Sequence, residues 1–210
     1  MMFIQTLFSD PRLFLSRLLI VVFSICIHEY IHALVAYKCG DSTAADHGHL
    51  TLNPFKQMGL ISLLMLCFLG IAWGQIPVNR QNLRGRHAAA LVAVSGPLSN
   101  LLLSLIFCFL AVAGAFLEFP VFAGDMMIYG AVINMVLTLF NLLPVPGLDG
   151  WNILRTYWQK DLSRSGEFIK GAFFILIMLL FTCFDYIYGA AAWTVIKFCN
   201  ALITLTGMIL

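Results

Sequence analysis

The feature that most constrains this chain is its long stretches without charge. Residues 88–117 and 126–148 contain no Asp, Glu, Lys or Arg. A helix needs about 20 mainly apolar residues to cross the hydrocarbon core of a bilayer. At most one charged residue occurs in each of four further apolar segments, 18–37, 58–75, 171–184 and 186–210. The pattern therefore predicts an all-α polytopic membrane protein with about five to six transmembrane segments.

Composition excludes several other classes of protein. Of the 210 residues, 61% are hydrophobic and only 10% are charged, whereas about a quarter of the residues in a soluble domain are charged. The net charge of +2 provides no basic stripe for phosphates, so we expect no nucleic-acid partner. Six cysteines are scattered without a C-x-x-C pair, which indicates small buried apolar residues and no disulfide framework.

Short loops leave no room for a separate soluble domain. We expect one membrane-embedded domain over residues 1–210, with a core at about 18–154 and a C-terminal helical pair at 168–210. Loops 40–57 and 73–79 are rich in Gly, Pro, Asn and Thr, which favours a small strand-like or re-entrant element after the first span. Basic residues place the loops near 80–86 and 155–164 in the cytoplasm. They leave open whether segment 58–75 spans or re-enters.

The first span carries the motif H-E-x-x-H, formed by His28, Glu29 and His32. Residues four apart on a helix share one face, so both histidines can bind one tetrahedral zinc with Glu29 beside the bound water. His28 lies near the middle of the apolar run, where ionisable groups are rare and usually functional. The alternative is a pair of histidines that hydrogen-bond to neighbouring helices.

A catalytic zinc site needs a third protein ligand, and the candidate is Asp149. It lies in the stretch 141–150, N-L-L-P-V-P-G-L-D-G. Two prolines cannot continue a helix and two glycines relax the backbone, which predicts an unwound end of the fourth span with Asp149 turned inward. The alternative is an ordinary helix stop followed by a solvated carboxylate.

Five ordered stretches carry a family resemblance: 28–32, 48–54, 74–79, 95–100 and 141–150. With them the chain resembles the site-2 protease family of intramembrane zinc metalloproteases, in its small prokaryotic branch without an extra soluble domain. The resemblance implies His28, His32 and Asp149 as ligands of one zinc per chain, and Glu29 as the catalytic residue. It also implies a first span that runs from outside to inside, which favours a re-entrant 58–75. Departures from the family pattern occur at Ser95, Gly147 and residues 75–76.

The implied reaction is hydrolysis of a peptide bond, with Glu29 as base and then acid. Asn141 is the candidate donor to the oxyanion, since it precedes Asp149 on the same span. Asn100 is a weaker candidate, because Asn in a packed span more often holds helices together. His47 and His49 lie in a loop and are left out of the metal site.

The expected substrate is a single-pass membrane protein whose helix unwinds near the cut. Its edge would pair with the strand-like loop at 49–53, and the last two spans would form a gate. We expect a multi-pass protein of a prokaryotic cell membrane, with its site open to the cytoplasmic side. The alternatives are a metal transporter and a catalytically silent, membrane-binding homologue. The sequence indicates neither the oligomeric state nor the natural substrate.

Overall fold

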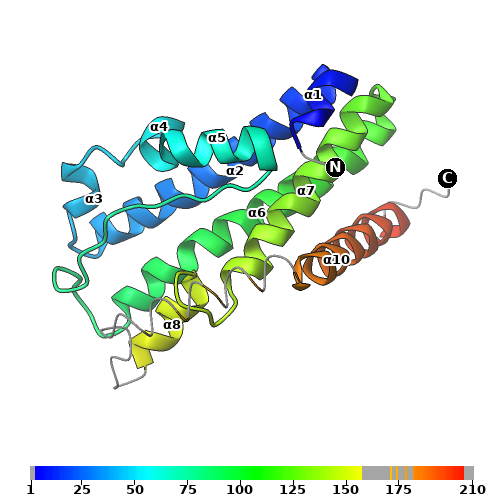
Figure 1. Cartoon of the computed structure of the whole chain (residues 1–210). Coiled ribbons are helices and arrows are strands. Elements are labelled where there is room, and N and C mark those ends of the chain that lie inside the picture. The colour runs from blue at the N-terminus through cyan, green and yellow to red at the C-terminus, as the bar shows by residue number, and fades with distance from the viewer. Residues whose placement is uncertain (1–2, 158–170, 172–173, 175–177, 179–181, 206–210) are drawn as a thin grey trace. The chain divides into compact units, whose positions relative to one another are not determined.

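Figure 1 shows the computed structural model, which describes residues 3–157, 171, 174, 178 and 182–205. Within these residues every regular element is a helix and no strand occurs. Four of the helices in this part of the chain are long and apolar enough to cross a membrane: α2 (Pro11–Lys38), α6 (Ala88–Phe116), α7 (Val121–Asn141) and α10 (Phe184–Leu205). They confirm an all-helical chain of the multi-pass membrane type. The expected segment 171–184 lies mostly outside the described residues.

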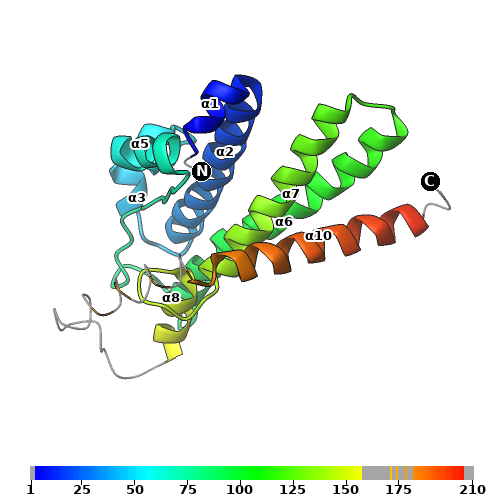
Figure 2. The ribbon, with the colours of Figure 1, turned by 45° about the vertical axis from the view of Figure 1, so that its right-hand side comes forward.

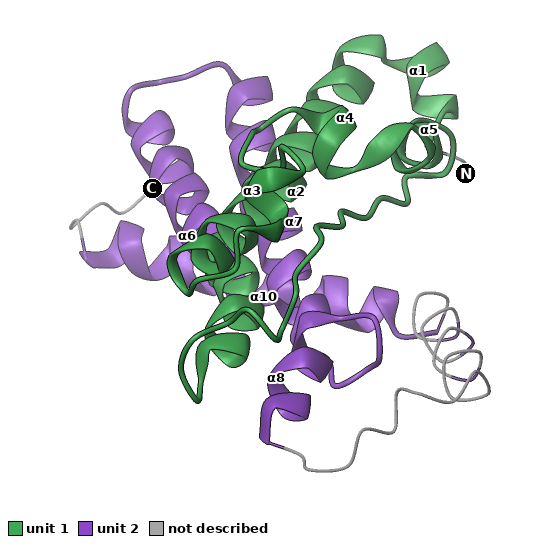
Figure 3. Cartoon of the chain, turned by 90° about the vertical axis from the view of Figure 1, so that its left-hand side faces the viewer, with its two compact units in different colours: residues 1–99 green, residues 100–210 purple. Residues whose placement is uncertain are grey.

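The chain divides into two compact units, residues 1–99 and 100–210 (Figure 3). The boundary falls inside α6, shortly after Pro97. Proline removes one backbone hydrogen bond from a helix interior and clashes with the preceding turn, so it bends or weakens the helix at this point. Each unit has its own packing. The expectation of one functional domain over the whole chain stays a prediction.

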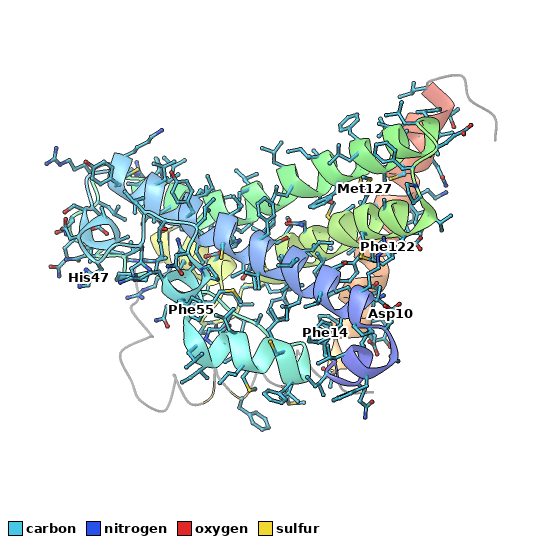
Figure 4. The ribbon with its side chains drawn as sticks, turned by 90° about the horizontal axis from the view of Figure 1, so that it is seen from above. Asp10, Phe14, His47, Phe55, Phe122 and Met127 are labelled. Atoms are coloured by element: carbon cyan, nitrogen blue, oxygen red, sulfur yellow. The ribbon has the colours of Figure 1, made fainter. Side chains whose placement is uncertain are left out.

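Helix α2 organises the first unit. The Asp10 side chain caps it by accepting a hydrogen bond from the Leu13 N–H at 2.9 Å, and Pro11 occupies the first turn, where no N–H is needed. The helix has 28 residues, about 42 Å in length, enough to cross a bilayer. Figure 4 shows Asp10 and Phe14 near one end of α2 and His47 beyond the other.

Besides α2 and the N-terminal part of α6, the first unit contains four short helices. They are α1 (Gln5–Ser9), α3 (Thr43–Asp46), α4 (Pro54–Gln57) and α5 (Gly59–Leu69). Helix α5 has 11 residues, about 16 Å in length, roughly half of the hydrocarbon core, so it cannot cross as a helix by itself. Gly70 ends it in the left-handed conformation, with φ of 76°. The expected segment 58–75 is therefore a short helix followed by non-helical chain.

The expected strand-like loop at 49–53 is not a strand. Its backbone bends, and the Gln57 side chain donates hydrogen bonds to the carbonyls of His49, at 2.8 Å, and Thr51, at 2.6 Å. The stretched part of this unit is residues 71–79 instead, which run without regular structure between α5 and α6 (Figures 1 and 3). We call residues 73–79 the extended segment.

The second unit packs the C-terminal part of α6, α7 and α10 around one apolar core (Figure 2). Its buried members are Cys108, Val112, Ala131, Val132, Met135, Val136, Ala191, Val195 and Cys199. All six cysteines are free, as the sequence predicts. Between α6 and α7 the buried Asn100 side chain donates to the Asn134 Oδ1 atom at 2.9 Å, and Ser104 donates to the Ala131 carbonyl at 2.8 Å. Such polar contacts between small residues are typical of helix packing in membranes.

Candidate metal centre and active site

The two histidines of the motif face each other on α2. Both side chains are buried, and the Nε2 atoms of His28 and His32 lie 3.0 Å apart. Their rings are nearly perpendicular, at 82°. The four-residue spacing accounts for this, because it places the two side chains one helical turn apart on the same face.

This geometry fits a tetrahedral metal ion. Two nitrogens that each bind zinc at about 2.0–2.1 Å in a tetrahedral site lie about 3.3 Å from each other, close to the observed 3.0 Å. The other ring nitrogen of His32, Nδ1, donates to the Val92 carbonyl on α6 at 2.6 Å. That bond leaves the Nε2 lone pair directed at His28. Metal-binding histidines typically donate their other ring N–H to a carbonyl or carboxylate in this way. The hydrogen bond to a neighbouring helix thus fixes the orientation of the His32 ring.

Helix α6 approaches the histidine pair through a glycine. A Cβ atom at Gly96 would overlap the Nε2 atoms of both His28 and His32. Ser95, beside it, donates to the same Val92 carbonyl that His32 uses, at 2.7 Å. Gly96 belongs to one of the stretches that carry the family resemblance, and its contact with the histidine pair is seen only in the fold.

Glu29 is covered by the extended segment. Its side chain is buried, 7% exposed, and a Cβ atom at Gly74 would overlap its carboxylate. The backbone of Gly74 therefore lies directly against the catalytic candidate. Gly74 belongs to one of the stretches that carry the family resemblance, but sequence reasoning assigned no role to it.

Asp149 lies in the second unit, at the first residue of α8 (Asp149–Tyr157). Helix α7 ends at Asn141, and a turn over 142–148 follows in which Gly147 has φ of 101°. The expected unwinding at the two prolines is present, although the helix ends earlier than the predicted residue 148. A Cβ atom at Gly150 would overlap the carbonyls of Leu142 and Leu143, so α8 starts tightly against the end of α7. The half-buried Asp149 stays a predicted ligand.

The two candidate oxyanion donors differ in their surroundings. The Asn141 amide donates to the Leu137 carbonyl of its own helix at 2.9 Å, and its side chain is half-buried. Its role in catalysis stays a prediction. Asn100 is fully buried against Asn134, whose own amide donates to the Gly130 carbonyl at 2.8 Å. Asn100 thus joins α6 to α7, which is the role that the sequence favours for an Asn in a packed span.

The two loop histidines, His47 and His49, differ in their surroundings. The exposed His47 donates from Nδ1 to the Thr43 carbonyl at 2.8 Å. Burial lowers the pKa of His49; a hydrogen bond with Gln57 opposes this, and the nearby Lys56 and His47 lower the pKa further. Within the described residues no group of three metal-ligating side chains includes either histidine.

Comparison with known proteins places the chain in a family. Residues 121–183 match the sequence model described as "Peptidase family M50". Over 169 residues the chain is 36% identical to "Putative zinc metalloprotease YwhC" of Bacillus subtilis, an alignment that covers 77% of each protein. The chain belongs to peptidase family M50, the site-2 protease family.

Further relatives of this M50 chain come from distant prokaryotes. It is 30% identical over 169 residues to "Putative zinc metalloprotease Rip2" of Mycolicibacterium smegmatis, covering 76% of this chain and 64% of that protein. It is 29% identical over 161 residues to "Putative zinc metalloprotease MJ0611" of Methanocaldococcus jannaschii, covering 72% and 78%. No solved structure matches the chain. The chain is thus a member of a zinc metalloprotease family with a candidate H-E-x-x-H metal site.

Proposed function

We propose that this M50 protein is a zinc-dependent intramembrane endopeptidase. It cleaves a peptide bond within or near the transmembrane helix of a single-pass membrane protein, as a step in regulated signalling. The observation that carries the proposal is the buried pair of Nε2 atoms 3.0 Å apart on an apolar helix, with Glu29 next to His28 in the chain. Placing ionisable side chains inside a membrane costs free energy, so such residues are rare there and usually have a function.

One zinc ion per chain is the proposed cofactor. His28, His32 and Asp149 offer two imidazole nitrogens and one carboxylate oxygen, a donor set that leaves a fourth position of a tetrahedral zinc open for water. Family membership supports zinc over other divalent metals. Asp149 is the proposed third ligand.

Glu29 is the proposed acid and base. A bound zinc would polarise the scissile carbonyl and lower the pKa of its water to about 7. Glu29 would take the proton of the attacking water and then deliver it to the leaving amine nitrogen. Val92 would keep His32 in the tautomer that binds metal, and Asn141 would donate a hydrogen bond to the oxygen that becomes negative.

The extended segment is the proposed place where the substrate backbone binds. Trp73 and Gln75 bond toward α5 and α4, while among the described residues no backbone partner is present for Gly74 and Ile76. An extended peptide can add to such a free edge, and Pro77 is compatible with an edge position. A substrate helix must unwind to do so, because its amide groups are otherwise bonded within the helix. This proposal replaces pairing at 49–53.

Location and topology are proposed on the same basis. Four apolar helices support a multi-pass protein of a prokaryotic membrane, and basic loops support a site open to the cytoplasm. A gate formed by the last two spans stays a proposal, since residues 158–170 and most of 171–181 lie outside the described chain.

The test uses the full chain purified in detergent and a single-pass reporter whose transmembrane helix contains helix-weakening residues. Glu29→Gln is expected to abolish cleavage while zinc stays bound. Glu118→Gln, which makes the same chemical change at an exposed position, is expected to leave cleavage intact. Bound zinc without cleavage of any reporter by the wild type would favour the transporter or the silent homologue.

A second comparison tests the third ligand. Asp149→Asn is expected to reduce the zinc content well below one ion per chain. Asp185→Asn serves as the matched control, because Asp185 also lies in the first turn of a helix and is not proposed to bind metal. Full zinc content in Asp149→Asn would remove Asp149 from the proposed site.

A further inference from the structure

The extended segment has no neighbouring strand among the residues that the structure describes, yet it is held at three points. A single hydroxyl, that of Ser62 on α5, accepts from the Trp73 N–H at 2.9 Å and donates to the Trp73 carbonyl at 2.6 Å. The Gln75 N–H donates to the Gln57 carbonyl at 3.0 Å. At the far end the Asn79 N–H donates to Asp41 Oδ2 at 2.7 Å.

Asp41 is a fully buried carboxylate at the end of α2. Besides the Asn79 N–H, it accepts from the Thr43 N–H at 3.1 Å, from the Thr43 hydroxyl, and from the Asn82 side-chain amide at 3.1 Å. Buried carboxylates are costly unless several donors satisfy them, and bonds to a charged acceptor are stronger than neutral ones. Asp41 therefore fixes one end of the extended segment relative to the helix that carries Glu29.

Ser62 fixes which residue of the extended segment lies against Glu29, because it holds the segment at the end opposite to Asp41. It is fully buried, and its two bonds to Trp73 replace those that a neighbouring strand would make. Gly74 is the next residue and the only one in 73–79 without a side chain. A shift by one residue would press Trp73 or Gln75 against the Glu29 carboxylate, where even a Cβ atom overlaps.

We infer that Asp41 and Ser62 are positioning residues, which hold the extended segment so that Gly74 meets Glu29 and the free edge receives substrate backbone beside it. The inference rests on the proposed function and adds two side chains far apart in the sequence. Neither residue touches the histidine pair in the described contacts. Their loss should therefore act on substrate binding and leave zinc bound.

The test compares two variants with matched controls in the full chain in detergent. Ser62→Ala removes both bonds to Trp73, and Asp41→Asn keeps the shape but loses the charge. The controls are Ser104→Ala, an equally buried hydroxyl between α6 and α7, and Asp46→Asn, the same charge change at an exposed site.

Hydrogen exchange, zinc content and steady-state kinetics are measured on each variant. We expect faster exchange in peptides covering 73–79, unchanged exchange in α2, and full zinc content. The KM for the single-pass reporter should rise about five- to tenfold, as expected for a lost hydrogen bond to a charged or buried group, with kcat within about twofold of wild type. The controls should show neither the local exchange nor the KM change.

Two results would overturn the inference. An unchanged KM despite faster exchange at 73–79 would show that the position of the segment does not matter for substrate. Protected amides at 73–79 in both variants would show that other contacts hold it. If the wild type cleaves no reporter, the proposed function fails, and the exchange data alone decide whether Asp41 and Ser62 hold the segment.

Discussion

The backbone of Gly74 lies against the carboxylate of Glu29, so that a methyl group at Gly74 would occupy the same space. The two residues are far apart in the chain and come from a helix and a non-helical segment of the same unit. This relationship connects the proposed base of the reaction to the proposed substrate-binding backbone. Substitution of Gly74 should therefore affect cleavage, and substitution of Gly96 should affect zinc binding.

Gly74→Ala is expected to lower cleavage at least about tenfold, because either Glu29 or the extended segment must move, and small misplacements of reacting groups have large effects on rate. Zinc should stay bound, since the three atoms nearest to a Cβ at Gly74 all belong to Glu29. Reporter cleavage and metal analysis measure both quantities. Gly124→Ala is the control, because a Cβ atom there meets no other atom within 4 Å. Normal cleavage by Gly74→Ala would contradict the close contact.

Gly96→Ala should act mainly on zinc binding, whereas Gly74→Ala should act mainly on cleavage. The new methyl group would overlap the Nε2 atoms that we assign to the metal, so zinc affinity is expected to fall by about ten- to a hundredfold, as for other disturbances next to metal ligands. Competition with a chelator measures the affinity. Gly189→Ala, on an open face of α10, should bind zinc like the wild type. Equal affinity in the two variants would place the metal elsewhere.

Asp41 should make stability depend on pH in the acidic range. Burial raises the pKa of this carboxyl group, but hydrogen bonds from Thr43, Asn79 and Asn82 lower it by more, so its pKa lies below the ordinary value. The ionised form therefore stabilises the folded chain above the unfolded pKa of about 3.9, and this contribution is lost as the pH falls through the lower, folded-state pKa.

The corresponding measurement is the difference in Tm between wild type and Asp41→Asn as a function of pH. It should be present at about pH 6 and shrink below about pH 4, as the carboxyl group becomes protonated first in the unfolded chain and then, at lower pH, in the folded chain. Asp46→Asn, at an exposed position, should show little difference throughout. A constant difference down to about pH 3 would mean that ionisation of Asp41 does not contribute.

Asn100→Ala should weaken the second unit without changing the chemistry. It removes the 2.9 Å bond to Asn134 between α6 and α7, and such bonds in membrane helices contribute about 0.6 kcal/mol on average and up to about 1.7. The Tm should fall while kcat per zinc-loaded molecule stays unchanged. A double-mutant cycle with Asn134→Ala measures the coupling. A loss of kcat at full zinc content would instead favour Asn100 as a catalytic donor.

Periodicity and hydropathy predict the helices well. The third segment, expected at 88–117, is α6 at 88–116, and the break at Pro144 and Pro146 ends α7 as proline chemistry requires. The histidine pair also follows from spacing alone, because four residues make about one helical turn. These features depend on residues close together in the chain, so they can be predicted from a short stretch of sequence.

The missed features are contacts between distant parts of the chain. Composition makes both 40–57 and 73–79 candidates for a strand-like element, and it does not indicate that the stretched chain is at 71–79 and not at the expected pairing site, 49–53. Nothing near Ser62 or Asp41 indicates that each bonds the backbone of a segment beyond α5. Only the fold brings these groups together.

The Asp41 carboxylate joins the end of α2 to the far end of the extended segment. Helix α2 carries His28, Glu29 and His32. The extended segment against Glu29 is therefore held in a fixed position relative to this helix, by Asp41 at one end and by Ser62 of α5 at the other. If other helices move to admit a substrate, the spacing between Glu29, the proposed proton acceptor, and the extended segment, the proposed peptide-binding backbone, stays unchanged. The relative position of the proposed acid and base and the proposed substrate-binding backbone would then be fixed before a substrate binds.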